Sequence, residues 1–236
     1  MKAGLSIAFE NLRGKAGNVV VSGGRSGIVL KNRVTAKNPR TASQQTVRSY
    51  FAKAAGAWKN LDTAQATAWN AYAQTLTKVN PVSGAQYHPS GFNTFVALGV
   101  KFLQINPSGT IPANPPTSGF IGDSITITAA GGTGTLTFTA TAANATGVKT
   151  EILLQQLPSK NRQPDPTKYR TKAFNNFSNL AHTYTATLAP GYWAAAYKFV
   201  NTATGQETPL QPLPVQQVTV ALELVEPKTV RQKKAA

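Results

Sequence analysis

The spacing of apolar positions changes near the middle of the chain, from the helical period of 3.6 residues to the period of two that strands show. In the first half we predict three amphipathic helices, over residues 42–59, from residue 63 onward, and over residues 91–104. Asp62 and Gln65 have the spacing of a capping box, and Ser90 stands where it would cap the third helix. Each helix is expected to bury one apolar stripe, and that of the first comprises Val47, Tyr50, Phe51, Ala54, Ala55 and Trp58.

A glycine-punctuated, basic segment precedes these helices. Residues 18–22 and 26–35 are rich in β-branched side chains and meet at Gly23-Gly24, which predicts a β-hairpin. In the Asn38-Pro39-Arg40-Thr41 junction, Pro39 favours an extended chain before it, and Thr41 is expected to cap the first helix. We therefore predict that residues 1–105 form a basic β-hairpin followed by a three-helix module.

The second half is separated from the first by a proline-rich stretch, residues 106–119, which we interpret as a linker between two domains. Residues 120–226 have the strand spacing of an antiparallel β-sandwich, and the predicted fold class is therefore α+β with two domains. A polar stretch at 158–180 predicts a long loop, and residues 227–236 form a basic tail. At least six strands are predicted, near residues 125–127, 136–140, 148–157, 183–188, 192–201 and 215–225.

Charge is the most unusual property of the composition. The chain has 24 Lys and Arg against 8 Asp and Glu, a formal net charge of +16. Such an excess is self-repulsive and favours an anionic partner, for which nucleic acid, an anionic membrane surface and an acidic protein shell all qualify. The candidate partner-binding or nucleic-acid-binding residues are Arg13, Lys15, Arg25, Lys31, Arg33, Lys37, Arg40, Arg48, Lys160, Arg162, Lys168, Arg170, Lys172, Arg231, Lys233 and Lys234.

Catalytic chemistry has little support in the sequence. The chain has no cysteine, and its two histidines, His88 and His182, each lack a second ligand at metal-binding spacing. Neither a phosphate-binding glycine loop nor a nucleophile elbow is present. We therefore expect no enzymatic activity, no catalytic residue, no cofactor, no metal and no small-molecule substrate. No apolar run has the length of a membrane span or the form of a secretory signal, so we expect synthesis in a cytoplasm and no membrane partner.

Two resemblances add to this interpretation. The motifs Gly14-Lys15-x-Gly17-x-Val19-Val20, Asn38-Pro39-Arg40-Thr41-x-x-Gln44-x-x-x-Arg48-x-x-Phe51 and Gly91-Phe92-Asn93-x-Phe95 occur in this order. Their order and spacing resemble a family of uncharacterised proteins from bacteria and their phages, known as a domain of unknown function. The resemblance covers about residues 4–105. It implies no known activity, but it implies a place among virion structural proteins.

The second resemblance lies in the C-terminal half. Leu188-x-Pro190-Gly191, followed by Tyr197-x-Phe199 and a turn at Gly205, is similar to the corner between strands E and F of fibronectin type III and immunoglobulin-like domains. Ala194 stands where the corner tyrosine of those domains is expected, which leaves either Tyr192 in its place or a different sandwich. The resemblance implies an accessory module of the kind found on phage capsids and tails.

These observations lead to a first hypothesis of a bacteriophage virion structural protein. It would be a minor capsid, decoration or connector-associated protein that docks on an acidic shell or on packaged DNA through its basic N-terminal module. Its expected partners are other virion proteins, capsid or tail subunits, in a multi-copy assembly. We expect it to be made in the host cytoplasm and located in the virion.

An alternative is a DNA-binding protein with a helix-turn-helix-like pair and a basic arm. The first two predicted helices would form the pair, and Gln44, Gln45, Arg48 and Lys53 would contact bases and phosphates. A third hypothesis is a membrane-surface or adhesion module.

Overall fold

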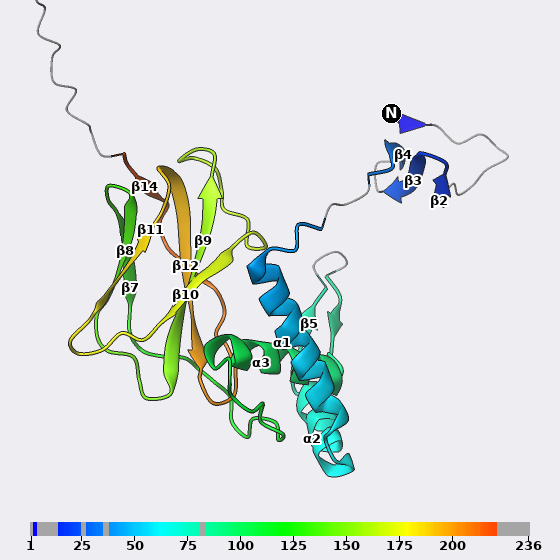
Figure 1. Cartoon of the computed structure of the whole chain (residues 1–236), viewed down its shortest axis with the longest axis horizontal. Coiled ribbons are helices and arrows are strands. Elements are labelled where there is room, and N and C mark those ends of the chain that lie inside the picture. The colour runs from blue at the N-terminus through cyan, green and yellow to red at the C-terminus, as the bar shows by residue number, and fades with distance from the viewer. Residues whose placement is uncertain (1, 4–13, 25–26, 35–37, 81–83, 221–236) are drawn as a thin grey trace, which may run out of the picture. The chain divides into compact units, whose positions relative to one another are not determined.

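The computed structural model describes residues 2–3, 14–24, 27–34, 38–80 and 84–220 (Figure 1). The chain divides into two compact units, residues 1–45 and residues 46–236. The proline-rich stretch at 106–119, which we expected between two domains, lies inside the second unit.

The first unit is a small antiparallel sheet with the strand order β1-β4-β3-β2. Its strands are β1 (Lys2–Ala3), β2 (Gly14–Ala16), β3 (Val19–Gly24) and β4 (Gly27–Asn32). β3 and β4 are the two strands of the predicted hairpin, whereas β1 and β2 were not predicted. Gly23 pairs with Ile28 and Gly24 with Gly27, so the predicted turn at Gly23-Gly24 is wrong. Residues 25–26, between the paired ends, lie outside the described residues.

Three helices follow, at the positions that the sequence predicts: α1 (Ala42–Lys59), α2 (Thr63–Gln74) and α3 (Gly91–Ile105). The predicted caps are confirmed. The Gln65 amide donates to the Asp62 side chain at 2.7 Å and the Gln65 side chain accepts from the Asp62 amide at 3.1 Å, while the Asn93 amide donates to Ser90 Oγ at 3.2 Å. A two-stranded hairpin, β5 (Lys78–Val79) with β6 (Gln86–Tyr87), lies between α2 and α3.

Aromatic side chains form the core among the helices. Trp69 is buried, and its ring meets the buried Phe95 edge to face at 5.1 Å; Trp58 meets Phe95 at 5.5 Å. The predicted stripe of α1 is only half correct, because Val47 and Phe51 are 48% and 54% exposed. The helical core contacts the C-terminal half of α1, where Ala54 is fully buried, and does not extend to the first turns.

The strands of the second half form a β-sandwich, as predicted, from two antiparallel sheets (Figure 1). The larger sheet has the order β10-β9-β12-β13, with β14 also paired to β12, and the smaller has the order β11-β8-β7. Apolar residues from both sheets, such as Phe138 and Ile152, form one core between them. The strands are β7 (Ile127–Gly131), β8 (Thr135–Ala140), β9 (Val148–Leu157), β10 (Arg170–Asn175), β11 (Thr183–Thr187), β12 (Gly191–Asn201), β13 (Gln211–Pro212) and β14 (Gln216–Val218).

The predicted loop at 158–180 contains a strand, β10, that the sequence did not reveal. β10 pairs with β9 and has a bulge between Thr171 and Ala173. It has β9 as its one neighbour in the sheet, and Arg170 and Lys172 are exposed on it. Polar residues on an edge strand hide the alternation by which strands are recognised.

The proline-rich stretch 106–119 is built into the second unit. The Trp69 indole donates to the Ala113 carbonyl at 2.7 Å, and Ile111 packs on the helical core. At the sandwich, the Gln206 side chain donates to the Ser118 carbonyl at 3.1 Å. The stretch is therefore held at the helices and at the sandwich.

Candidate interaction surfaces

The sheet of the first unit has one basic and one apolar face. Cross-strand partners in an antiparallel sheet share a face, and neighbours along a strand alternate between faces. Val20 pairs with Lys15 on one side and with Lys31 on the other, so these three residues share a face. The opposite face carries the pair Val21 and Leu30 and, farther along the same two strands, Val19 and Ile28.

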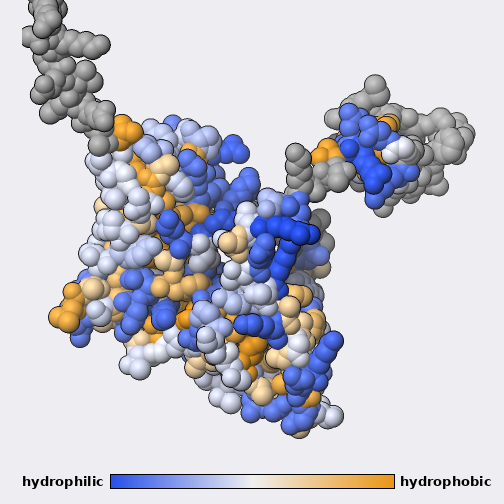
Figure 2. All heavy atoms as spheres, viewed as in Figure 1, coloured by the Kyte–Doolittle hydropathy of each residue, from blue (hydrophilic) through white to orange (hydrophobic). Residues whose placement is uncertain are grey.

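Arg33 extends the basic face. Its amide donates to the Asn18 carbonyl at 2.7 Å, which continues the register in which Lys31 pairs with Val20. Lys15, Lys31 and Arg33 are all exposed, and no Asp or Glu occurs among the described residues of this unit. In the view of Figure 2 the described atoms of the unit are mostly hydrophilic. We call Lys15, Lys31 and Arg33 the basic face.

The junction before α1 has an unusual backbone. Arg40 has a φ of 48°, the one positive value at a non-glycine among the described residues. Its carbonyl accepts a hydrogen bond from the Gln45 side chain at 3.0 Å, and its amide donates to the Asn38 side chain at 3.4 Å. The Gln44 amide donates to Thr41 Oγ1 at 3.4 Å, in the position of the expected cap. Neighbouring side chains therefore hold this turn of the chain.

The remaining candidate residues are spread over the chain. Arg48 is exposed on α1, seven residues beyond Thr41, and belongs to the second unit. The other predicted N-terminal and C-terminal cations lie outside the described residues; they are Arg13, Arg25, Lys37, Arg231, Lys233 and Lys234.

A second group of cations lies before and on β10: Lys160, Arg162, Lys168, Arg170 and Lys172. All five are exposed, but two of them contact their own loop. The Arg170 guanidinium donates to the carbonyls of Thr167 and Tyr169 at 3.1 and 3.0 Å, and Lys168 pairs with Asp165 at 3.4 Å. Hydrogen bonds from the Thr167 amide and hydroxyl, together with Lys168, hold the pKa of Asp165 below its ordinary value. Part of this group therefore organises the loop.

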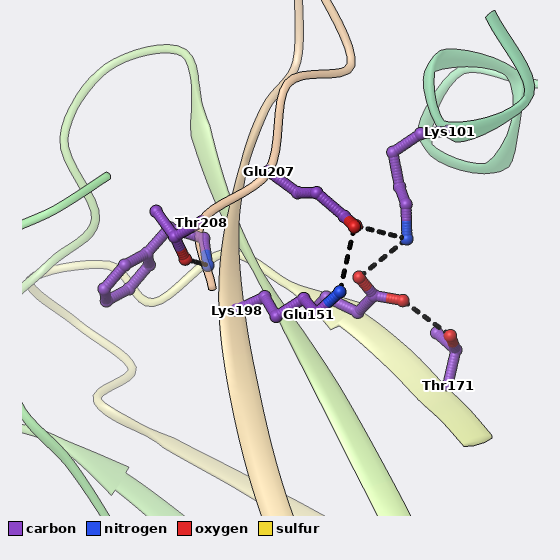
Figure 3. A network of polar contacts seen from close by, with 7 residues as sticks. Lys101, Glu151, Thr171, Lys198, Glu207 and Thr208 are labelled. Carbon is purple, nitrogen blue, oxygen red and sulfur yellow. Dashed lines mark hydrogen bonds and ion pairs between the residues drawn. The ribbon is translucent and has the colours of Figure 1, made fainter. Parts of the chain in front are cut away.

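Sequence reasoning missed an ion-pair network that joins α3 to the larger sheet (Figure 3). Lys101 of α3 lies 2.8 Å from Glu151 of β9 and 3.0 Å from Glu207, and Lys198 of β12 lies 2.9 Å from Glu207. The Thr171 hydroxyl donates to the second oxygen of Glu151. The Glu151 side chain is only 1% exposed. The one signal in the sequence was an isolated acid within the apolar run of β9.

The charges of this network are mutually stabilised. Burial disfavours the charge of Lys101, but the nearby carboxylates of Glu151 and Glu207 outweigh it and raise the pKa of Lys101 above its ordinary value. Burial likewise disfavours a charged Glu207, yet Lys101 and Lys198 lower the pKa of Glu207 below its ordinary value. We assign the network a structural role, because each charged group in it already has an opposite charge as its neighbour.

A depression of about 620 Å³ lies beside the network, between α2, α3 and the turn at Gly205. Its charged lining residues are Lys78, Lys101 and Glu207, and the last two are paired with each other. The lining therefore offers no nucleophile beside a base and no pair of acids. Within the described ranges, no three His, Asp or Glu side chains gather as metal ligands would, and no helix has the length and apolarity to cross a membrane.

At the corner before β12, which resembles that of fibronectin type III domains, a tryptophan and not a tyrosine donates the hydrogen bond to the backbone. Ala194 is buried, and the indole of Trp193 donates to the Ala189 carbonyl, four residues upstream, at 2.9 Å. A corner tyrosine makes its bond to the backbone in this way. Trp193 therefore supplies the bond that we had considered for Tyr192.

Comparisons with known proteins give matches in structure alone. No protein-family model matches the chain, and no curated protein matches its sequence. A fibronectin type III domain of the human fibronectin type III domain containing protein 3 has a TM-score of 0.29 at 11% identity and covers 45% of this chain and 94% of its own.

Two further solved structures are of the same kind. The FN1–FN3 domains of chicken CNTN1 match with a TM-score of 0.29 at 12% identity, over 42% of this chain and 33% of theirs. An Fn3-like protein from Clostridium thermocellum matches with a TM-score of 0.27 at 17% identity, over 42% of this chain and 95% of its own. At such scores the three matches assign neither a family nor a function to this chain.

Proposed function

We propose that this chain is a structural interaction protein of a bacteriophage particle, a minor capsid, decoration or connector-associated protein. It docks through its N-terminal unit on an acidic protein shell or on packaged DNA. The charge of that unit carries the proposal: residues 1–45 hold eight Lys and Arg and one Glu, so they contribute +7 of the total +16. Such a concentration of one sign favours association with an anionic partner.

The second unit supports a scaffolding role in this proposal. Its helices and its sandwich are joined by the Lys101 network and by the anchored stretch 106–119. Its described residues present no catalytic constellation. We propose that the sandwich is a fibronectin-type accessory module, which bridges neighbouring subunits while the basic unit holds the particle.

The alternative, a helix-turn-helix DNA-binding protein, has less support. α2 would be the recognition helix, yet it carries no Lys or Arg between Thr63 and Gln74. Its cap is built on an aspartate, Asp62, which would repel phosphates at the end of the helix that enters the groove.

Particle composition tests the proposal. Particles from a culture that produces the chain are purified on a density gradient, treated with nuclease and salt, and analysed by quantitative mass spectrometry. We expect a fixed number of copies per particle that exceeds background host proteins. Finding the chain only as a free monomer in the host lysate would contradict the proposal.

A further inference from the structure

We infer that the basic face of the N-terminal sheet binds the phosphate backbone of duplex DNA without reading its base sequence. The inference rests on the proposed function and specifies its partner. It assigns the contact to Lys15, Lys31 and Arg33, and not to the basic loop before β10.

The register of the sheet places these cations close together. Lys15 and Lys31 stand on either side of Val20, on strands two steps apart, which is a separation of about 10 Å at the usual strand spacing. Arg33 follows Lys31 by two residues, about 7 Å along the chain. Three exposed cations therefore share one side of a small sheet, and the other side is apolar.

The other residues on this face favour phosphates over bases. Those whose side chains are described include Val20, Ser22 and Val29, which are small and have no aromatic ring. Proteins that hold single strands stack bases on aromatic side chains, and proteins that read a duplex present side chains that fork onto base edges. This face offers positive charge without aromatic rings, and such a surface binds the phosphates of DNA independently of the base sequence.

The same composition argues against an acidic protein as the partner. The centres of protein interfaces are enriched in aromatic residues, Met and Arg, whereas Lys, Ser and Ala are depleted there. Among the described side chains on this side of the sheet are two lysines, a serine, two valines and a single arginine. Lysine serves phosphate well as a mobile point charge.

The experiment compares the parent protein with three full-length variants by fluorescence anisotropy on a labelled duplex of mixed sequence, between 50 and 200 mM NaCl. The face variant carries Lys15→Gln, Lys31→Gln and Arg33→Gln. The matched control carries Lys160→Gln, Arg162→Gln and Lys172→Gln, which removes the same charge from exposed positions. A charge-keeping variant, Lys15→Arg with Lys31→Arg, tests whether the sheet tolerates substitution.

Each phosphate contact contributes about 0.9 to the slope of log affinity against log salt. We therefore expect the face variant to lose about 2.7 from the slope, so that its affinity falls about 40-fold less than that of the parent over this salt range. The control is expected to change the slope by less than 1, and the charge-keeping variant to bind as the parent does.

Three outcomes would overturn the inference. They are an equal loss of slope in the face variant and the control, no loss in the face variant, or binding of poly-L-glutamate with the same affinity and dependence on the basic face. The last outcome would indicate an acidic protein partner, and the proposed function would stand. The proposed function is tested by a different experiment, and the absence of the chain from purified particles would contradict it.

Discussion

Glu151 is the one charged residue that is buried in the part of the chain that the structure describes. It is a carboxylate with 1% exposure between the larger sheet and α3, and its two oxygens accept hydrogen bonds from Lys101 and Thr171. A buried ion pair adds little net stability, but removing one partner leaves an uncompensated buried charge. Removing the partner of Glu151 should therefore lower the free energy of unfolding strongly, through the junction between α3 and the larger sheet.

Replacing Lys101 by Met tests this role. We expect the free energy of unfolding to fall by about 3–5 kcal/mol, because the Glu151 charge loses its partner. Urea unfolding followed by tryptophan fluorescence measures the change. Lys168→Met removes an exposed pair and is expected to cost less than about 1 kcal/mol. Equal effects of the two substitutions would refute the role given to Lys101.

The same network predicts how stability depends on pH. The pKa of Glu207 is lowered in the folded chain, so its contribution is present above the ordinary pKa of a glutamate and is lost as pH falls below it. The pKa of Lys101 is raised, so its contribution persists up to the ordinary pKa of a lysine and is lost above it. We expect thermal unfolding temperatures to fall at both extremes. Glu207→Gln should flatten the acid side, and an unchanged acid profile would contradict this assignment.

The sequence could not reveal this network. Lys101 and Glu151 are 50 residues apart, and each looks like a single charge on a helix or a strand. By contrast, the Asp62–Gln65 cap was predictable because its partners are three residues apart. Hydrogen bonds between residues close in sequence can be predicted from residue spacing. Contacts between a helix and a sheet depend on how the chain folds and packs.

At the scale of elements, a helix and a turn of the second unit approach each other closely at Gly205. Its φ is +74°, and a Cβ added there would lie 2.3 Å from the Leu98 carbonyl oxygen of α3. The turn between β12 and β13 can therefore reach α3 only with glycine at this position. This contact lies on the same side of the sandwich as the Lys101 network.

Gly205→Ala should separate the turn from α3 and lower the free energy of unfolding by more than about 2 kcal/mol. Gly134→Ala is the control, because Gly134 has a φ of +63° and open space around it. It is expected to cost only about 1 kcal/mol, the penalty of a left-handed backbone. Chemical denaturation of both variants measures the difference, and similar losses would argue against close packing at Gly205.

The errors in the predicted elements share a physical origin. β10 was missed because an edge strand tolerates Arg170 and Lys172, and the first turns of α1 were given a buried face that they do not have. Hydrophobic period identifies which side of an element is apolar. It does not tell whether another element covers that side, as the exposed Phe51 illustrates.

For the whole molecule, we expect the first unit to contribute much of the positive charge and the second unit to set the thermal stability. All three tryptophans, Trp58, Trp69 and Trp193, belong to the second unit. Removing residues 1–40 takes away eight cations and one acid, which lowers the formal charge from +16 to +9. We expect the thermal transition seen by tryptophan fluorescence to stay within about 2 °C, while retention on a cation-exchange or DNA column falls sharply. A large drop in the transition temperature would show that the first unit stabilises the second.

The anchored stretch between the helices and the sandwich has a mechanical consequence. A proline-rich linker without such contacts would let the helices and the sandwich reorient independently, and it would extend under force. Here the chain is bonded at Ala113 and at Ser118, and the Lys101 network adds a further connection between the helices and the sandwich. A torque applied to the helices would therefore be transmitted to the sandwich, and the two would rotate together.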